Sequence, residues 1–189
     1  MKVLVGCEES QVVTSAFRAL GHEAYSCDLL PTRGRAEWHF QCDVFSVIGL
    51  GWDIGIFHPD CTYLANSGNR WHSGSQQRAQ AIEFVERLWD AAACIPRVCV
   101  ENPVGALSTK SRLGSPSQII HPWQYGHGET KATCLWLRAL PLLTPTNVVP
   151  ERVQRVWKMS PGPFRKRDRS TTYLGWAEAM AAQWGTLSV

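Results

Sequence analysis

The chain has 189 residues, a net charge of +3 and 44% hydrophobic residues, which is enough apolar surface for the core of one domain. No apolar run approaches the roughly 20 residues of a membrane-spanning helix, and no signal peptide precedes the first apolar run, so we expect a cytoplasmic protein without a membrane partner. The seven cysteines are odd in number and include no Cys-x-x-Cys pair, which argues against a disulfide framework and indicates a reducing compartment.

Apolar and amphipathic stretches alternate along the chain, as expected for strands and helices in turn. We predict strands over residues 2–6, 23–28, 52–57, 97–101 and 133–137, a short unit over 41–45, and helices over 11–20, 76–93 and 174–184. The stretch from 102 to 132 is expected to be irregular. Such alternation is typical of an α/β domain, in which helices cover both faces of a mostly parallel sheet.

Acidic residues stand at the ends of the early strands, where open α/β sheets bind their ligands. Asp28 is placed to hold ribose hydroxyls, and Asp43 could contact an adenine amino group. The first turn lacks the glycine-rich pattern that binds a pyrophosphate, because Gly6 is followed by a cysteine and two glutamates. Glu8 and Glu9 would tolerate the sulfonium of S-adenosylmethionine; alternatively, they stabilise the amino terminus of the following helix.

The buried strand at 52–57 leads directly into a polar loop, HPDCTYLANSG at 58–68, which carries Cys61. The next predicted strand ends in Glu101, followed by Asn102. Because the carboxyl ends of parallel strands meet at one edge, we expect the thiol and the carboxylate to face the same cleft, where they would suit covalent chemistry on a pyrimidine ring. His58 is expected to cap its strand, and a metal site with Cys61 is disfavoured because a second pair of ligands is missing.

Positive charge is concentrated between residues 151 and 170, where seven basic residues accompany two acidic ones. The rest of the chain holds twelve basic and fourteen acidic residues, so this segment carries +5 and the remainder −2. Trp157 and Phe164 interrupt the charges, a pattern that suits either contact with a phosphate backbone or a solvated loop. The predicted nucleic-acid contacts are Arg165, Lys166, Arg167 and Arg169.

These motifs together resemble the DNA cytosine-5 methyltransferases. The loop at 58–68 is similar to the Pro-Cys loop of that family, VENPVG at 100–105 is similar to its Glu-Asn-Val motif, and Lys131 stands at the place of its arginine-bearing motif. The similarity covers residues 2–137 and the last helix, and the chain looks most like the short methyltransferase-like proteins of bacteriophages. It implies a single Rossmann-like class I methyltransferase domain over 1–189, whose target-recognition region is reduced to a short basic insertion at about 144–172.

The resemblance also implies roles for individual residues. Cys61 would add to carbon 6 of cytosine, Glu101 would contact ring N3 and the exocyclic amine, and Asn102 would hold the strand end. Lys131 could hold the substrate or its phosphate, and Tyr63 or Trp71 could pack against a flipped base. No metal is expected. S-adenosylmethionine would lie against Gly6, Cys7, Glu8, Asp28, Leu29, Asp43, Val44 and Pro59.

Two departures from the family pattern leave alternatives open. Asp60 replaces the proline before the cysteine, and a carboxylate beside a thiol raises the thiol pKa. The basic insertion is too short for extensive reading of bases in the major groove. The alternatives are an enzyme of the same fold that modifies a pyrimidine mononucleotide such as dCMP, and a catalytically silent binder of nucleic acid or nucleotides. The target sequence and the oligomeric state are not predicted.

Overall fold

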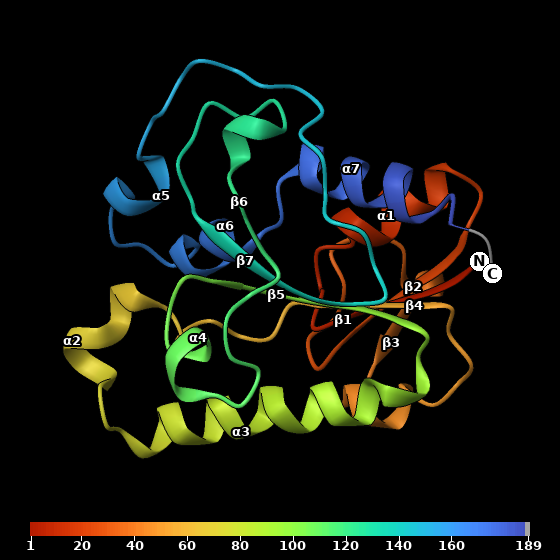
Figure 1. The fold of residues 1–189 in the computed structure, drawn as a ribbon, viewed down its shortest axis with the longest axis horizontal. Coiled ribbons are helices and arrows are strands. Elements are labelled where there is room, and N and C mark those ends of the chain that lie inside the picture. Colours follow the sequence, from red (N-terminus) through yellow and green to blue (C-terminus); the bar gives the residue numbers. More distant parts are fainter. Residues whose placement is uncertain (188–189) are drawn as a thin grey trace.

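A computed structural model describes residues 1–187, apart from the side chain of Trp157. The role predicted for the Trp157 side chain in the basic segment therefore lies outside the described residues. Seven strands form one sheet in the order β3-β2-β1-β4-β5-β7-β6 (Figure 1). The strands are β1 (Lys2–Gly6), β2 (Glu23–Asp28), β3 (His39–Gln41), β4 (Ile54–Phe57), β5 (Arg97–Pro103), β6 (Gln118–Ile120) and β7 (Thr133–Arg138). Strands β1 to β5 pair in parallel, whereas β7 runs antiparallel to both β5 and β6.

Helices cover both faces of this sheet, which confirms the predicted architecture. In Figure 1, α1 and α7 lie on one side of the sheet and α3 lies on the other. The helices are α1 (Val12–Ala19), α2 (Asn69–His72), α3 (Gln76–Ala91), α4 (Leu107–Lys110), α5 (Arg155–Lys158), α6 (Arg165–Ser170) and α7 (Leu174–Trp184). Short 3-10 turns occur at η1 (Ala36–Trp38), η2 (Val44–Ser46), η3 (Asn66–Gly68), η4 (Ala92–Cys94) and η5 (Pro122–Gln124). None of the helices in the described part of the chain is long and apolar enough to cross a membrane.

The central strands contribute to two hydrophobic cores, because successive side chains of a strand point to opposite faces. In β4, Ile54 and Ile56 join the core that contains Trp176 of α7, whereas Phe57 joins the core that contains Leu88 of α3. A strand whose residues are buried on both faces needs a continuous apolar run, which is the pattern that predicted β4.

The elements that differ from prediction are short or set by one polar contact. The unit predicted at 41–45 is the strand β3 followed by η2, because the Asp43 carboxylate accepts the Phe45 amide at 3.0 Å and so ends the extended chain. The stretch expected to be irregular contains β6 and α4, which have three and four residues. Strands of this length are stabilised by their neighbour in the sheet, here β7, rather than by a pattern of their own.

The cysteine loop after β4 is attached to the segment after β5 through a very close approach of the two backbones. Ala65 and Gly105 form an antiparallel bridge. A Cβ atom on Gly105 would lie 2.0 Å from the Leu64 carbonyl oxygen, so only glycine fits here.

We therefore expect Gly105→Ala to lower the free energy of unfolding by about 1–3 kcal/mol, the usual cost of forcing atoms into a packed region. Gly49→Ala is the matched control, because a Cβ at Gly49 would meet nothing within 4 Å. Urea titrations of both variants measure the difference. Equal stability of Gly105→Ala and Gly49→Ala would contradict the close approach.

Candidate active site

A buried hydrogen bond links the ends of two neighbouring strands. Phe57 of β4 pairs with Val100 of β5, so the next residues, His58 and Glu101, lie side by side at the carboxyl edge. His58 Nδ1 and Glu101 Oε2 are 2.9 Å apart, and both side chains are about nine-tenths buried. Burial alone would lower the pKa of His58 and raise the pKa of Glu101, but their mutual hydrogen bond and attraction win, so the pKa of His58 is raised and that of Glu101 is lowered.

Backbone and amide contacts hold the cysteine loop against this pair. Asn102 Nδ2 donates to the Pro59 carbonyl at 2.8 Å. The Asn66 amide donates to the Val104 carbonyl at 3.1 Å, and the Ala106 amide donates to the Leu64 carbonyl at 2.8 Å. Asn102 thus links the end of β5 to the loop after β4, and its predicted role in the site stays a prediction.

Cys61 is half-buried and belongs to neither hydrophobic core. Burial raises the pKa of its thiol, the charge of Lys131 lowers it, and the charges of Glu101 and Asp60 raise it, which leaves the pKa above its ordinary value. The effect expected for Asp60 from the sequence has this sign. The predicted residues Cys61, Glu101 and Lys131 therefore lie within electrostatic reach of one another.

Lys131 reaches the site from the loop before β7. Its ammonium donates to the Arg169 carbonyl at 2.9 Å and lies over the rings of Tyr173 and Trp176, at 5.7 and 5.9 Å from their centres. The same charge lowers the pKa of Glu101. This position suits a group that stabilises negative charge, whereas contact with a substrate phosphate is not tested.

The basic segment lies against the cysteine loop. Lys166 of α6 pairs with Asp60 at 2.8 Å, and Asp60 also accepts the Thr62 amide and hydroxyl. Burial would raise the pKa of Asp60, but the hydrogen bonds from Lys166 and Thr62 hold it below its ordinary value. A segment more than a hundred residues away in sequence thus partly neutralises the carboxylate beside Cys61.

The other predicted nucleic-acid residues also make contacts within the protein. Arg167 pairs with Asp168 at 2.8 Å, and its guanidinium lies 4.4 Å from the centre of the Phe164 ring. Arg165 Nε donates to the Met159 carbonyl at 2.9 Å, and Arg169 offers its own carbonyl to Lys131. The segment therefore combines exposed charges with internal pairs, and its binding to nucleic acid stays a prediction.

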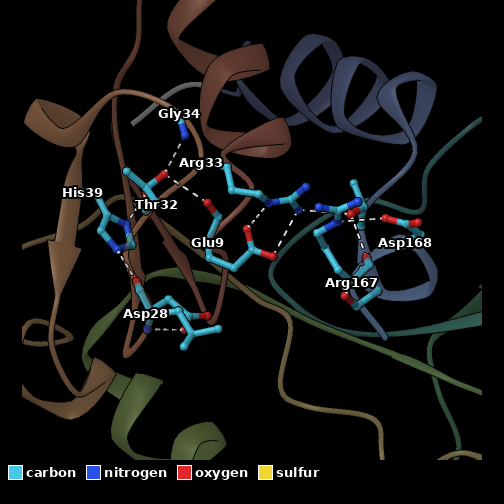
Figure 2. A network of polar contacts seen from close by, with 12 residues as sticks. Glu9, Asp28, Thr32, Arg33, Gly34, His39, Arg167 and Asp168 are labelled. Carbon is cyan, nitrogen blue, oxygen red and sulfur yellow. Dashed lines mark hydrogen bonds and ion pairs between the residues drawn. The ribbon is translucent and has the colours of Figure 1, made fainter. Parts of the chain in front are cut away.

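The two glutamates of the first turn have partners inside the protein. Glu8 is buried and accepts the amides of Val13 and Thr14 at 2.7 and 3.3 Å, so it caps α1. Glu9 pairs with Arg33 through both carboxylate oxygens, and Figure 2 shows this pair beside Thr32, which donates to the Glu9 carbonyl. These contacts fit the helix-terminus interpretation of Glu8, and its predicted contact with a cofactor remains untested.

Acidic side chains from other segments influence Cys7. The backbone of Cys7 has a φ of 59°. Burial and the charges of Asp28, Asp43 and Asp60 raise the pKa of the Cys7 thiol to about 12. The Asp28 carboxylate accepts the Leu30 amide through Oδ1, as Figure 2 shows for this part of the loop. Asp28 ends β2, Asp43 follows the end of β3 and Asp60 follows the end of β4, and carboxylates on this side of the sheet suit a ligand with a positive centre.

The remaining predicted cofactor residues differ in their surroundings. Leu29 is 72% exposed beside Asp28 and is therefore free to pack against a ligand. Val44 is buried, and Gly6 makes room for the Phe57 ring, because a Cβ on Gly6 would lie 2.5 Å from that ring. Pro59 contributes the carbonyl that Asn102 holds. No group of three or more possible metal ligands occurs within residues 1–187.

Sequence reasoning missed two contacts of the site. His58 was expected to cap a strand, yet it is the partner of Glu101. The available signal was position, since His58 follows Phe57 as Glu101 follows Val100, and these two strand residues pair. The ion pair of Asp60 with Lys166 has no comparable signal in the sequence, because nothing in either segment indicates that the two residues meet.

No family model matches the sequence, and no curated protein matches it either. Among solved structures, the crystal structure of the Dnmt2 methyltransferase of S. pombe is similar with a TM-score of 0.51 and 14% identity, over 85% of this chain and 55% of that chain. A protein assigned as a DNA modification methyltransferase encoded within an E. coli prophage has a TM-score of 0.47 and 14% identity over the same shares, which is too distant to add to this. The chain spans about half the length of these proteins. Its fold is a Rossmann-like methyltransferase fold.

The opposing charges around Cys61 lead to a prediction about its reactivity. Asp60→Asn keeps the contacts with Thr62 but removes a charge that raises the thiol pKa, so Cys61 should be alkylated by iodoacetamide at lower pH. Lys131→Gln removes a charge that lowers the thiol pKa, so alkylation of Cys61 should then require a higher pH. Mass spectrometry of the Cys61 peptide across pH measures both shifts.

Asp43→Asn serves as the control, since Asp43 acts on the Cys7 thiol and is not among the charges that act on Cys61. Its Cys61 profile should match the wild type. If alkylation of Cys61 had the same pH dependence in Asp60→Asn and Lys131→Gln, the proposed positions of these two charges beside the thiol would be contradicted.

Proposed function

We propose that the chain is an S-adenosylmethionine-dependent methyltransferase that acts on carbon 5 of cytosine in DNA through a covalent adduct with Cys61. The supporting observation is that Cys61, Glu101 and Lys131 influence one another at the carboxyl edge of adjacent strands in a methyltransferase fold. In this proposal residues 1–189 form one methyltransferase-like domain, with the basic insertion at about 144–172 as its reduced recognition region.

The chemistry starts from the low reactivity of carbon 5. When the Cys61 thiolate bonds to carbon 6, the electron pair of the 5,6 double bond shifts and carbon 5 becomes nucleophilic. Bound S-adenosylmethionine supplies the methyl group to that carbon. A water molecule would take the proton from carbon 5, and the electrons of that C–H bond would re-form the 5,6 double bond as the Cys61 thiolate leaves. The thiol must first lose its proton, because its pKa in the free protein lies above the ordinary value.

Glu101 would stabilise the charge that develops on the ring. One carboxylate oxygen can accept the exocyclic amine, and the carboxyl group can present a proton to N3. Glu101 is ionised in the free protein, because His58 and Lys131 lower its pKa; the His58 side chain, whose pKa is raised, would supply the proton that passes through Glu101 to N3. We therefore assign His58 as a positioning residue that orients Glu101 and holds this proton in the site.

The cofactor would lie against the ends of β1, β2 and β3. The carboxylates of Asp28 and Asp43 would hold its ribose and adenine amino groups, and the sulfonium would benefit from the acidic surroundings of Cys7. Leu29 would cover the adenine with its exposed side chain. Arg165, Lys166, Arg167 and Arg169 would contact the phosphate backbone of DNA from beside the cysteine loop.

A pyrimidine mononucleotide is the second candidate substrate. The observation in its favour is the size of the insertion, whose helices α5 and α6 have only four and six residues. Reading several base pairs normally buries at least about 600 Å² of protein surface. A free nucleotide would need no such surface.

Transfer of a labelled methyl group from S-adenosylmethionine to duplex DNA, single-stranded DNA and dCMP tests the proposal. We expect DNA to be methylated, Cys61→Ala to abolish transfer, and Glu101→Gln to reduce it by about 10²–10³-fold, as for loss of one preorganised stabilising group. Cys94→Ala is the matched control, since Cys94 is an exposed cysteine away from the cysteine loop.

Methylation of dCMP alone would favour the mononucleotide enzyme. Cofactor binding without transfer to any substrate would favour a silent binder. Activity of Cys61→Ala equal to that of the wild type would rule out the covalent mechanism.

A further inference from the structure

A hollow of about 470 Å³ lies on the surface beside the cysteine loop. Asn69 and Arg70 of α2, Arg78 of α3, and Thr109 and Lys110 of α4 contribute to its wall. Figure 1 shows α2, α4 and the beginning of α3 together at one end of the molecule. The wall includes Asn66 of the cysteine loop but neither Cys61 nor Glu101.

Arg78 is a buried arginine that has no carboxylate partner among the described residues. Its residue exposure is 3%, and a guanidinium stays charged at any ordinary pH. Nε donates to the Tyr63 carbonyl at 2.7 Å and Nη1 donates to Asn69 Oδ1 at 2.6 Å. Within the described residues, Nη2 is buried and has no hydrogen-bond partner. A buried charge without a counter-ion is costly, so this group calls for an anion.

The rest of the wall has the composition of an anion site. Arg70 and Lys110 add two exposed cations, and the hydroxyl groups of Ser73 and Thr109 add donors. None of the eight residues of the wall is acidic. No salt bridge involves Arg70, Arg78 or Lys110 in the part of the chain that the structure describes. A guanidinium, an ammonium and hydroxyl groups are the donors that recognise phosphate.

The hollow is directly connected to the loop that carries the nucleophile. Arg78 holds the carbonyl of Tyr63, two residues after Cys61, and Ala106 in the wall donates its amide to Leu64. Trp71, next to Arg70, is 72% exposed and its ring lies 5.1 Å from the Arg70 guanidinium. An exposed aromatic ring beside a cationic site is a common arrangement for nucleotides.

We propose that this hollow binds a phosphate group of the nucleotide substrate whose base reaches Cys61. The assignment of the substrate rests on the proposed function, whereas phosphate binding itself requires no methyl transfer. A purely structural role for Arg78, in which it links α3 to the cysteine loop, accounts for the hydrogen bonds that Nε and Nη1 donate. It does not account for the two further cations, Arg70 and Lys110, that line the same hollow, and it leaves the buried Nη2 without a partner among the described residues.

The test uses Arg70→Gln combined with Lys110→Gln, because both side chains are exposed. The variant is titrated calorimetrically, without S-adenosylmethionine, with dCMP, with a short single-stranded oligodeoxynucleotide and with phosphate-free deoxycytidine. We expect an affinity loss of about tenfold or more for a phosphate-bearing ligand, as for loss of hydrogen bonds to a charged group, and no change for deoxycytidine. Arg87→Gln is the control, since Arg87 is an exposed cation of α3 outside the wall.

The ligand that loses affinity identifies the source of the phosphate. A loss for dCMP identifies a phosphate monoester, and a loss for the oligonucleotide with a smaller salt dependence, by about 0.7 in slope per lost contact, identifies a backbone phosphodiester. Unchanged affinity for both ligands, no binding of either by the wild type, or an equal loss in Arg87→Gln would overturn the inference. If phosphate affinity is lost in the variant but the wild type transfers no methyl group, the inference stands and the proposed function fails.

Discussion

Two backbone hydrogen bonds between segments 64–66 and 104–106 fix the cysteine loop against the end of β5. They form only because Gly105 has no side chain to keep the Leu64 carbonyl away. Asn102 adds a third link through the Pro59 carbonyl. Since Glu101 immediately precedes Asn102 and Cys61 lies inside the held loop, these links fix the separation between the backbones of Cys61 and Glu101. Every step proposed for the site depends on that separation.

The charges of the site are arranged in pairs around one thiol. His58 and Glu101 form a buried pair, Asp60 and Lys166 form a surface pair, and Lys131 stands over aromatic rings. The charge of Lys131 lowers the pKa of Cys61, and burial outweighs it. The free protein therefore keeps Cys61 as a thiol near neutral pH, which protects it from indiscriminate reaction. The phosphate hollow gives a reason for the strict fixation of the loop, because a nucleotide held at Arg78 would be positioned relative to Cys61 by the same backbone.

The sequence was sufficient to predict what local patterns determine. The apolar runs of β1, β2, β4 and β5 predicted the sheet, and the rule that ligands bind at the carboxyl edge of strands brought Cys61 and Glu101 together. Contacts that depend on register or on distant segments could not be predicted. The pairing of His58 with Glu101 requires the alignment of β4 with β5. Lys166 meets Asp60 across more than a hundred residues of sequence. Arg78 resembles any polar residue of an amphipathic helix, and only the fold shows that it is buried.

Trapping of a covalent adduct tests the central claim most directly. In 5-fluorocytosine a fluorine replaces the carbon 5 proton, and because fluorine does not leave as a proton does, the thiolate cannot be expelled after methyl transfer. The protein is incubated with S-adenosylmethionine and an oligonucleotide containing this base, or with 5-fluoro-dCMP. The account predicts an adduct that survives denaturation and maps to the peptide of Cys61. The absence of an adduct with a ligand that the protein binds, or an adduct on any other residue, would contradict it.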